Sequence, residues 1–252
     1  MTTHTHATAL LLALCSSMAW AQSSPDTNWS GFHAGGFLGA TQGHSDARTV
    51  TGRLQYFVAE DAVQIARAGD NKLSQSNASG GLSIGWNKQF DRVLVGVEAS
   101  ANSLSFDKTK VRGEVYDTVP GTSFSIRQTV RANWMSALRL RLGWAQGNWL
   151  AYVSGGVART QLKLDVTFTD NAFDGYSRTS RSESVTGPTL GVGGEYALDA
   201  KWSIRGDYHV TRFGSIHAAS DVTSTNNSGG TLLHQADLTV QSAFVGLNYR
   251  FK

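Results

Sequence analysis

Apolar and polar residues alternate one by one along eight separate stretches of this chain. A period of two residues is typical of a β-strand whose two faces meet different environments. The stretch near the C-terminus shows it most clearly, because the odd positions from 243 to 251 are apolar or aromatic while Ser242, Asn248 and Arg250 lie between them. The eight predicted strands are, approximately, Ser30–Gly43, Ala78–Gln89, Arg92–Phe106, Arg127–Trp144, Trp149–Phe168, Arg181–Ala197, Lys201–Ile216 and Ala236–Phe251.

The connections between these strands alternate strictly between short and long. Tight turns are predicted at Asp91, at 146–148 and at 199–200, whereas long polar stretches make the other four connections. This alternation is typical of an outer-membrane barrel, which also needs an even number of strands. A soluble sandwich or lipocalin would alternate too, but with its charged face outside. The sequence therefore predicts an all-β fold: an eight-stranded antiparallel transmembrane up-and-down barrel with short periplasmic turns and long extracellular loops.

Aromatic residues and composition support a membrane environment. Beside the predicted short turns or the C-terminus, where an interfacial girdle belongs, lie Trp86, Phe90, Trp144, Trp149, Tyr196, Trp202, Tyr249 and Phe251. Only 16% of the 252 residues are charged, and the mean hydropathy of −0.22 fits an average over two opposed faces. The net charge of +3 and the scattered basic residues make a nucleic-acid partner unexpected.

The first 21 residues have the organisation of a secretory signal peptide. A short apolar core ends at Cys15, the only cysteine, and Ala19 and Ala21 occupy the small-residue positions before a cleavage site at Gln22. The apolar core is far shorter than the roughly 18 residues that a membrane-spanning helix needs. The predicted parts of the chain are a signal peptide over 1–21, a linker over 22–29 and a barrel over 30–252.

The parity of the strands, with Phe251 taken to face lipid, places seven charged residues on the inner face. They are Glu98, Arg139, Arg141, Glu195, Arg205, Asp207 and Arg250. An isolated charge in a narrow interior is costly, so we expect these groups to form a paired network. Eight strands enclose just enough room for side chains to fill the barrel. The network is predicted to be a structural plug, and the alternative is a gated pathway for small solutes, made pH-sensitive by His33 and His209.

Short motifs along the chain resemble a known family. Residues 29–36, WSGFHAGG, are similar to the opening strand W-[ST]-G-F-Y-x-G of the small outer-membrane immunogenic proteins, and 244–251, FVGLNYRF, to their ending F-x-G-x-x-Y-x-F. These porin-family proteins of Gram-negative bacteria belong to the OmpA-like barrel superfamily. The resemblance implies a barrel in the cell outer membrane whose terminal aromatic residues, here Tyr249 and Phe251, form the signal read by the barrel-assembly machinery. The chain departs from the family pattern at His33 and by ending in Lys252.

Two long connections are candidates for surface recognition, because loops on a rigid scaffold usually carry it. The first, 44–77, has an apolar patch at 54–58, and its segment 59–68 either forms a short helix or extends the hairpin. This connection is predicted to be a solvated hairpin extension, and the functional alternative is an adhesion or antigenic surface. The fourth, 217–235, is rich in Ser, Thr, Asn and Gly and is expected to be mobile.

No catalytic residue, metal site or cofactor is predicted. No histidine is followed by a serine two positions later, as the deacylases among small barrels require, and no pair of histidines has the H-x3-H spacing of a metal site. His217 and His234 lie at opposite ends of the fourth connection. They would approach each other if this connection closed as a hairpin, which leaves a weak metal or haem contact open.

The sequence thus predicts a non-enzymatic outer-membrane barrel that contributes to envelope integrity and surface interaction. A small passive diffusion porin is the main alternative, followed by a haem-binding surface protein or a lipid-modifying barrel enzyme. The expected partners are outer-membrane lipids and lipopolysaccharide, the barrel-assembly machinery and periplasmic chaperones during biogenesis, and host surface molecules.

Overall fold

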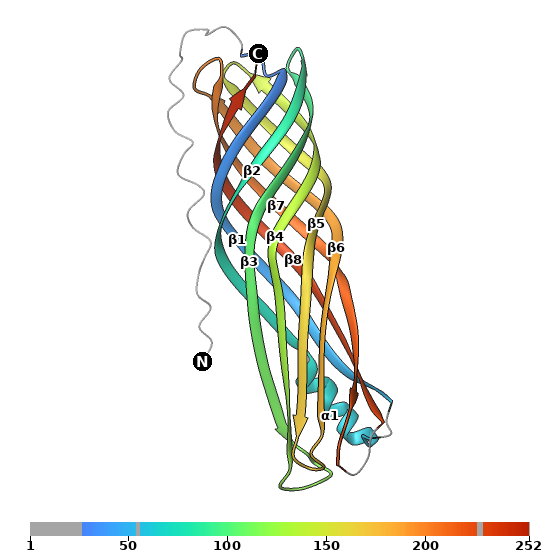
Figure 1. Ribbon diagram of the computed structural model, residues 1–252. Helices are drawn as coiled ribbons and strands as arrows, with labels where there is room; N and C mark the ends of the chain where they lie inside the picture. The colour runs from blue at the N-terminus through green and yellow to red at the C-terminus, as the bar shows by residue number, and fades with distance from the viewer. Residues whose placement is uncertain (1–26, 54–55, 226–228, 252) are drawn as a thin grey trace.

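Eight antiparallel strands form a closed ring in the computed structural model, which describes residues 27–53, 56–225 and 229–251. Each strand pairs with its neighbours in sequence, and the first pairs with the last (Figure 1). The predicted eight-stranded barrel is confirmed. The predicted signal peptide with Ala19, Ala21 and Gln22, and also Lys252, lie outside the described residues. The elements are β1 (Gly31–Arg53), α1 (Ala59–Gly69), β2 (Asn71–Phe90), β3 (Val93–Val115), β4 (Ser123–Gln146), β5 (Trp149–Asp170), β6 (Tyr176–Ala197), β7 (Trp202–Val222) and β8 (Gly230–Arg250).

Tight turns join the strands at one end of the ring, which we call the short-turn end. They follow β2, β4 and β6, where the sequence predicts them. Asp91 and Gly147 have positive φ angles of 53° and 58° there, a backbone conformation that tight hairpins require. The two ends of the molecule therefore differ sharply in how their strands are connected.

The strands run far beyond the length that a membrane needs. Each has 20 to 24 residues, whereas about 9–11 residues cross a bilayer. β2 pairs with β3 only over Gly81–Phe90, and β6 with β7 only over Thr189–Ala197. Beyond that level the ring opens at two seams and continues as two facing sheets, β3-β4-β5-β6 and β7-β8-β1-β2. We call the closed part the barrel and the two-sheet part, with α1, the head; its strand segments are 42–53, 71–78, 104–115, 123–133, 159–170, 176–187, 212–222 and 230–241.

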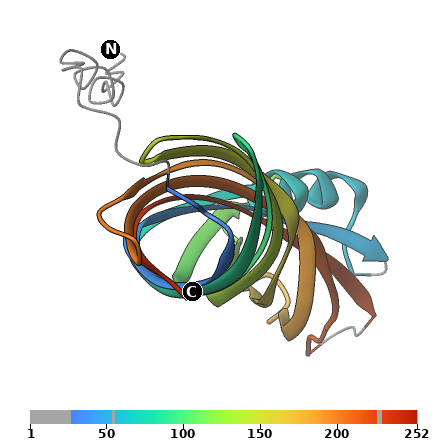
Figure 2. The same ribbon diagram turned by 90° about the horizontal axis from the view of Figure 1, so that it is seen from above.

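Contacts far from the short-turn end hold the two sheets of the head together. Helix α1 buries Ile65, and its Gln64 side chain donates to the Val115 carbonyl of β3 at 3.1 Å, so the helix reaches across the β2–β3 seam. Tyr176 and Thr223 form a β-bridge across the other seam. Viewed along the barrel in Figure 2, the head leans to one side of the ring. No helix among the described residues is long and apolar enough to cross a membrane.

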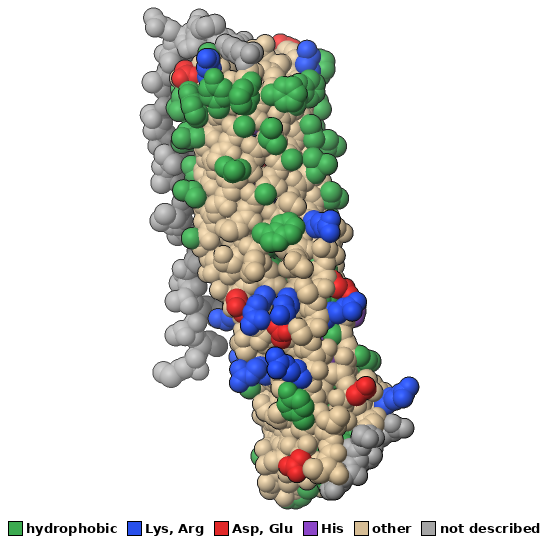
Figure 3. Space-filling model, in the orientation of Figure 1, with side chains coloured by type: hydrophobic (Ala, Val, Ile, Leu, Met, Phe, Trp, Pro, Cys, Tyr) green, Lys and Arg blue, Asp and Glu red, His purple; other side chains and the backbone are tan. Residues whose placement is uncertain are grey.

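The polar and apolar faces of the strands are reversed between the barrel and the head. In the barrel part of β5, Val153 and Val157 are exposed outside while Ser154 is buried inside. In the head part of the same strand, Lys163 lies outside and Leu164 inside. In Figure 3, hydrophobic side chains are scattered over the visible barrel face, and Lys and Arg gather beyond them. The barrel is apolar outside and polar inside, whereas the head has the usual arrangement of a water-soluble domain.

The expectation of loops over 44–77 and 217–235 is wrong for most of their length. The first segment contains the end of β1, all of α1 and the start of β2, so the helix and the hairpin extension both occur. In the second segment, residues 217–222 belong to β7 and residues 230–235 to β8. At 42–49 the outward residues and the inward Ser45 and Thr49 are mostly polar. The alternation therefore disappears although the chain stays extended.

Candidate functional site

A network of charged side chains crosses the barrel from wall to wall, centred on Arg205 of β7. Its Nη1 donates to Glu98 Oε2 at 2.6 Å, its Nη2 to Glu98 Oε1 at 3.2 Å and its Nε to Asp207 at 2.5 Å. Glu98 belongs to β3, which is not a neighbour of β7 in the ring. Because a bidentate arginine–carboxylate pair is among the strongest hydrogen-bonded arrangements, it ties two separate walls together.

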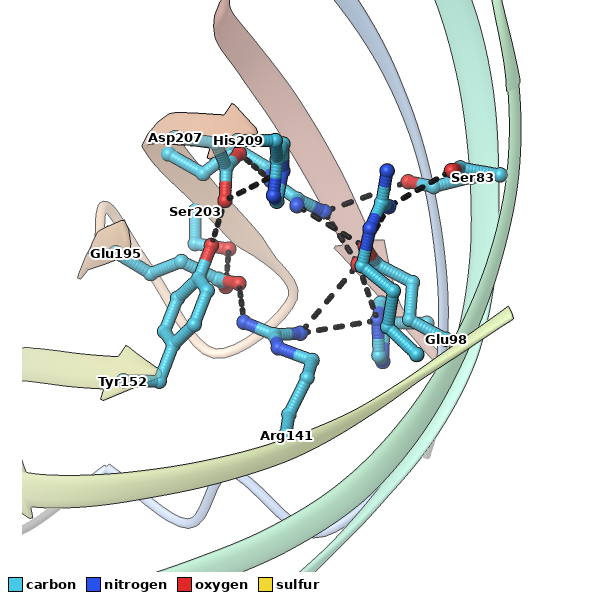
Figure 4. Close-up of polar contacts among 12 residues, drawn as sticks. Ser83, Glu98, Arg141, Tyr152, Glu195, Ser203, Asp207 and His209 are labelled. Carbon is cyan, nitrogen blue, oxygen red and sulfur yellow. Dashed lines mark hydrogen bonds and ion pairs between the residues drawn. The ribbon is translucent and has the colours of Figure 1, made fainter. Parts of the chain in front are cut away.

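Arg141 of β4 organises the other half of the network (Figure 4). Its Nη2 donates to Glu195 of β6 at 2.5 Å, and its Nη1 lies 3.6 Å from Glu98 Oε2. The guanidinium carbon lies 3.8 Å from the centre of the Tyr152 ring of β5, and the Tyr152 hydroxyl donates to Asp207. Side chains of five consecutive strands, β3 to β7, are thus joined in one layer.

Smaller polar groups complete this layer. Arg139 donates to the Ser100 hydroxyl at 2.9 Å, and the Ser203 hydroxyl donates to Glu195 at 3.2 Å. His33 of β1 places Nε2 3.3 Å from Arg141 Nη1, which brings a sixth strand into contact. The Ser100 and Ser203 hydroxyls were not predicted in this layer, because serine occurs all along the chain, whereas His33 was predicted in the barrel interior as a pH-sensitive group.

Six of the seven charged residues predicted inside the barrel belong to this layer. Three acids face three bases, and each of the six is between 2% and 7% exposed: Glu98, Glu195 and Asp207, with Arg139, Arg141 and Arg205. Arg250 is also buried but lies apart, since its Nη2 donates to the Asp199 carbonyl at 2.7 Å and its guanidinium covers the Trp29 ring at 4.5 Å. Charge balance and pairing offset the several kcal/mol that each unpaired buried ion costs.

Glycine leaves the space that these long side chains occupy. A Cβ atom on Gly193 would lie 2.5 Å from the Tyr152 ring and 2.6 Å from Asp207 Oδ1. One on Gly85 would lie 2.5 Å from the His33 ring. The inward glycines opposite the network are therefore required by its packing.

Apolar layers lie on both sides of the charged layer. Toward the short-turn end, Trp29, Leu94 and Leu150 belong to one buried cluster. Toward the head, the Phe37 and Phe244 rings pack with centroids 4.7 Å apart. Beyond them the head is filled by an apolar core that includes Phe106, Ile126, Leu162, Leu164, Phe168, Ile216, Leu232 and Leu238. The chemistry of the interior thus changes from apolar to ionic and back to apolar along the axis.

A second buried polar cluster crosses the head, and sequence reasoning missed it. The Asn71 amide donates to Gln128 at 2.8 Å, and Gln128 donates to the Thr49 hydroxyl at 2.9 Å. Thr49 bonds to His234 Nδ1, and Ser220 to His234 Nε2, each at 2.9 Å. The cluster connects the two sheets. Its members come from β1, β2, β4, β7 and β8, so only inward polar positions in each strand could have indicated it.

His234 does not form a metal or haem site with His217. His217 is exposed on the outer face, whereas His234 is 2% exposed and points inward, so that hypothesis is wrong. Among the described residues no group of three or more His, Cys, Asp or Glu side chains is suited to a metal ion. Burial lowers the pKa of His234 to about 4, and hydroxyls rather than a carboxylate orient its ring. Ser220 and His234 therefore form a structural hydrogen bond and lack the orienting acid of a catalytic triad.

Residues 7–251 match the family model described as outer membrane protein beta-barrel domain. The chain belongs to this family. The 31 kDa outer-membrane immunogenic protein of Brucella melitensis is 25% identical over 219 residues, which cover 86% of this chain and 83% of that protein. The 25 kDa outer-membrane immunogenic protein of Brucella abortus is 25% identical over 228 residues, 90% and 82% of the two chains. Among solved structures, Ail, the attachment invasion locus protein of Yersinia pestis, has a TM-score of 0.38 at 14% identity, covering 86% of this chain and 99% of Ail.

The protein lies in the cell outer membrane, and the outer surface of its barrel has the band of apolar side chains that contact with lipid requires. At the short-turn end, the aromatic rings of Trp149 and Tyr196, and of Trp202 and Tyr249, pack with centroids 4.8 and 5.1 Å apart. At the opposite edge of the band, the exposed Trp134 lies ten residues before Trp144 on β4. A tilted membrane strand has this length. Bacterial outer-membrane barrels have their short turns in the periplasm, and in that orientation the head projects from the cell.

Proposed function

We propose that this protein is a non-enzymatic, non-conducting outer-membrane barrel that anchors and displays its head, and so contributes to envelope integrity and surface interaction. The observation that carries the proposal is the filled interior. A layer of paired charges crosses the barrel, and apolar layers lie above and below it. An ion entering from either side would have to pass buried apolar side chains, Leu94 and Leu150 on one side and the Phe37–Phe244 pair on the other, where charge is disfavoured.

The charged layer serves this anchor by joining its walls. The Arg205–Glu98 and Arg141–Glu195 pairs link strands that are not neighbours in the ring, so the interior resists ovalisation and opening. A gated channel would need this layer to rearrange, and the apolar core of the head would still close the path beyond it. These two features favour the plug over the porin alternative.

The outer end of the head supports the part of the proposal that concerns surface interaction. The Tyr56 and Tyr116 hydroxyls both donate to Asp170 Oδ2, at 2.7 and 3.3 Å. Burial, assisted by the Asp170 charge, raises the pKa of both tyrosines, so they remain hydrogen-bond donors. A rigid tip of this kind presents a defined surface at a low entropic cost. The Brucella relatives are named immunogenic, which agrees with an exposed head.

Planar-bilayer recording tests the conductance part of the proposal. Protein whose folding is verified by its heat-dependent gel mobility should give no reproducible single-channel steps, while a general porin recorded in the same bilayers does. The double variant Glu98→Ala/Arg205→Ala should also remain silent, because the apolar layers persist. Regular steps from the folded wild type would overturn the plug and support a diffusion porin.

Cysteine labelling of intact cells tests the display of the head, since the described residues contain no cysteine. Phe173 lies exposed in the turn after β5, and Ala200 lies in a short turn. A membrane-impermeant maleimide should label Phe173→Cys in intact cells and Ala200→Cys only after the outer membrane is permeabilised. The reverse pattern would refute the orientation. Incubation with lipid A or phospholipid, followed by mass spectrometry, should show no new product; a time-dependent loss of an acyl chain would establish an enzyme.

A further inference from the structure

A groove on the outer surface lies at the junction of the barrel and the head. It arises from a bulge in β4, where the register with β5 shifts between Arg131 and Met135. The groove has a volume of about 170 Å³. A groove of this size holds several water molecules, which is room for a phosphate group. Its lining is Arg131, Ala132, Asn133, Trp134, Gln161, Lys163 and Ser182.

The depth of this groove matches the headgroups of a membrane lipid. Trp134 marks the edge of the apolar band, and Arg131 follows three residues farther from the barrel on the same strand. Three strand residues span about 10 Å or less along the membrane normal. The groove therefore begins at the acyl chains and ends among the polar groups of the outer leaflet.

The charges at the groove favour an anion. Arg131 is held in place by Asp107 at 3.0 Å from Nε and by Asp165 at 2.8 Å from Nη1, and neither bond uses Nη2. Lys163 Nζ lies 3.6 Å from Asp165, and its side chain is 43% exposed. Arg159, two positions before the groove-lining Gln161, donates only to the Ser184 hydroxyl. The groove thus has three cationic side chains and two carboxylates, which leaves one net positive charge. The two carboxylates also hold the Arg131 guanidinium in position.

Basic residues are also in greater excess on the sheet of the head that carries the groove than on the facing sheet. The sheet that carries the groove has nine basic residues against five acidic ones in its head segments: Lys108, Lys110, Arg112, Arg127, Arg131, Arg159, Lys163, Arg178 and Arg181 against Asp107, Glu114, Asp165, Asp170 and Glu183. The facing sheet has four against three in its head segments: Arg48, Arg53, Lys72 and Arg212 against Asp46, Asp221 and Asp237. Figure 3 shows Lys and Arg gathered beyond the apolar band on this side.

We propose that the groove binds a phosphate group of the phosphorylated glycolipid in the outer leaflet. Arg131 and Lys163 contact the phosphate, Asn133, Gln161 and Ser182 supply hydrogen bonds to the adjoining sugar, and the Trp134 ring lies against the first part of an acyl chain. This assignment is independent of whether the barrel conducts. It adds a specific lipid partner to the proposed role in envelope integrity.

Native mass spectrometry of the folded protein, titrated with bisphosphorylated lipid A, tests this site. The double variant Arg131→Gln/Lys163→Gln should bind about 10- to 30-fold more weakly than the wild type, from about 1 kcal/mol for each cation near a charged lipid surface. The control Lys110→Gln/Arg112→Gln removes the same charge from exposed positions farther along the head and should change binding less than threefold. All proteins must show the heat-dependent gel shift of the folded barrel.

Two further probes identify the ligand. Dephosphorylated lipid A should bind weakly and equally to the wild type and the Arg131→Gln/Lys163→Gln variant. Phosphatidylglycerol should bind the wild type at least tenfold more weakly than bisphosphorylated lipid A. An equal loss in the control variant would overturn the localised site in favour of a diffuse basic face. Equal binding of phosphatidylglycerol would overturn the assignment to a glycolipid.

Discussion

Replacing Arg205 by methionine provides a quantitative test of the charge network. The substitution keeps an unbranched side chain of similar length but removes both bonds to Glu98, at 2.6 and 3.2 Å, and the bond to Asp207. Glu98 retains His33 and Arg141 at 3.6 Å and Arg139 at 3.8 Å. The layer then holds three acids and two bases.

The expected cost follows from leaving one carboxylate without its main partner. Removing one member of a buried ion pair costs about 3–5 kcal/mol. Because two other arginines remain within 4 Å of Glu98, we expect about 3 kcal/mol for Arg205→Met. Adding Glu98→Gln restores the balance of two acids and two bases. We expect the double variant to be only about 0–2 kcal/mol less stable than the wild type, well below the sum of the two single costs.

Urea unfolding in lipid vesicles, followed by tryptophan fluorescence and gel mobility, measures these differences by linear extrapolation. Arg159→Met makes the same chemical change on the outer surface and should cost less than about 1 kcal/mol. Additive costs for the Glu98 and Arg205 variants would refute the paired network. A loss below 1 kcal/mol for Arg205→Met alone would refute it as well.

Three other perturbations separate the head from the barrel. Burial lowers the folded-state pKa of His234 from 6.5 to about 4, so the unfolded head takes up a proton before the folded head does as the pH falls. The head should therefore be fully stable above pH 6.5 and lose up to about 3 kcal/mol of stability between pH 6.5 and 4. Hydrogen exchange in β8 should report this loss, and His234→Gln should flatten its pH dependence. Leu164→Ala in the head core should cost about 2–5 kcal/mol and speed proteolysis of the head while the barrel keeps its gel shift, in contrast to the exposed control Thr169→Ala. Gly193→Val should prevent the barrel from closing, because its side chain would overlap Tyr152 and Asp207, whereas Gly206→Ala, where a Cβ meets nothing within 4 Å, should fold.

The barrel was predictable from the sequence because each of its strands separates lipid from a polar lumen. That contrast fixed the parity, and with it the inward position of residues such as Glu98 and Arg205. The head was not predictable in the same way. On β5 the outward residues change from Val157 to Arg159 while the strand continues without a bulge, so a scan for one apolar face ends at the boundary. The partners within the network, and the isolation of Arg250 from it, depend on side-chain reach across the lumen, which periodicity does not contain.

The same exchange of polarity sets the depth of the protein in the membrane. On β5 and β7 the last apolar outward residues, Val157 and Val210, are followed two positions later by Arg159 and Arg212. A basic residue on the lipid face costs little at the interface but about 2–4 kcal/mol at the bilayer midplane, so each step inward becomes more costly. If the barrel moved outward, apolar side chains of the band would be exposed to water at a cost of about 25 cal/mol per Å².

These opposing free-energy costs on β5 and β7 hold the barrel at one depth, which keeps the groove among the lipid headgroups. From that level β4 continues for ten residues from Asn133 to Ser123, about 33 Å of strand. The tips of the head therefore stand clear of the headgroups. A lipid can reach the groove, whereas a large soluble partner meets the tips first.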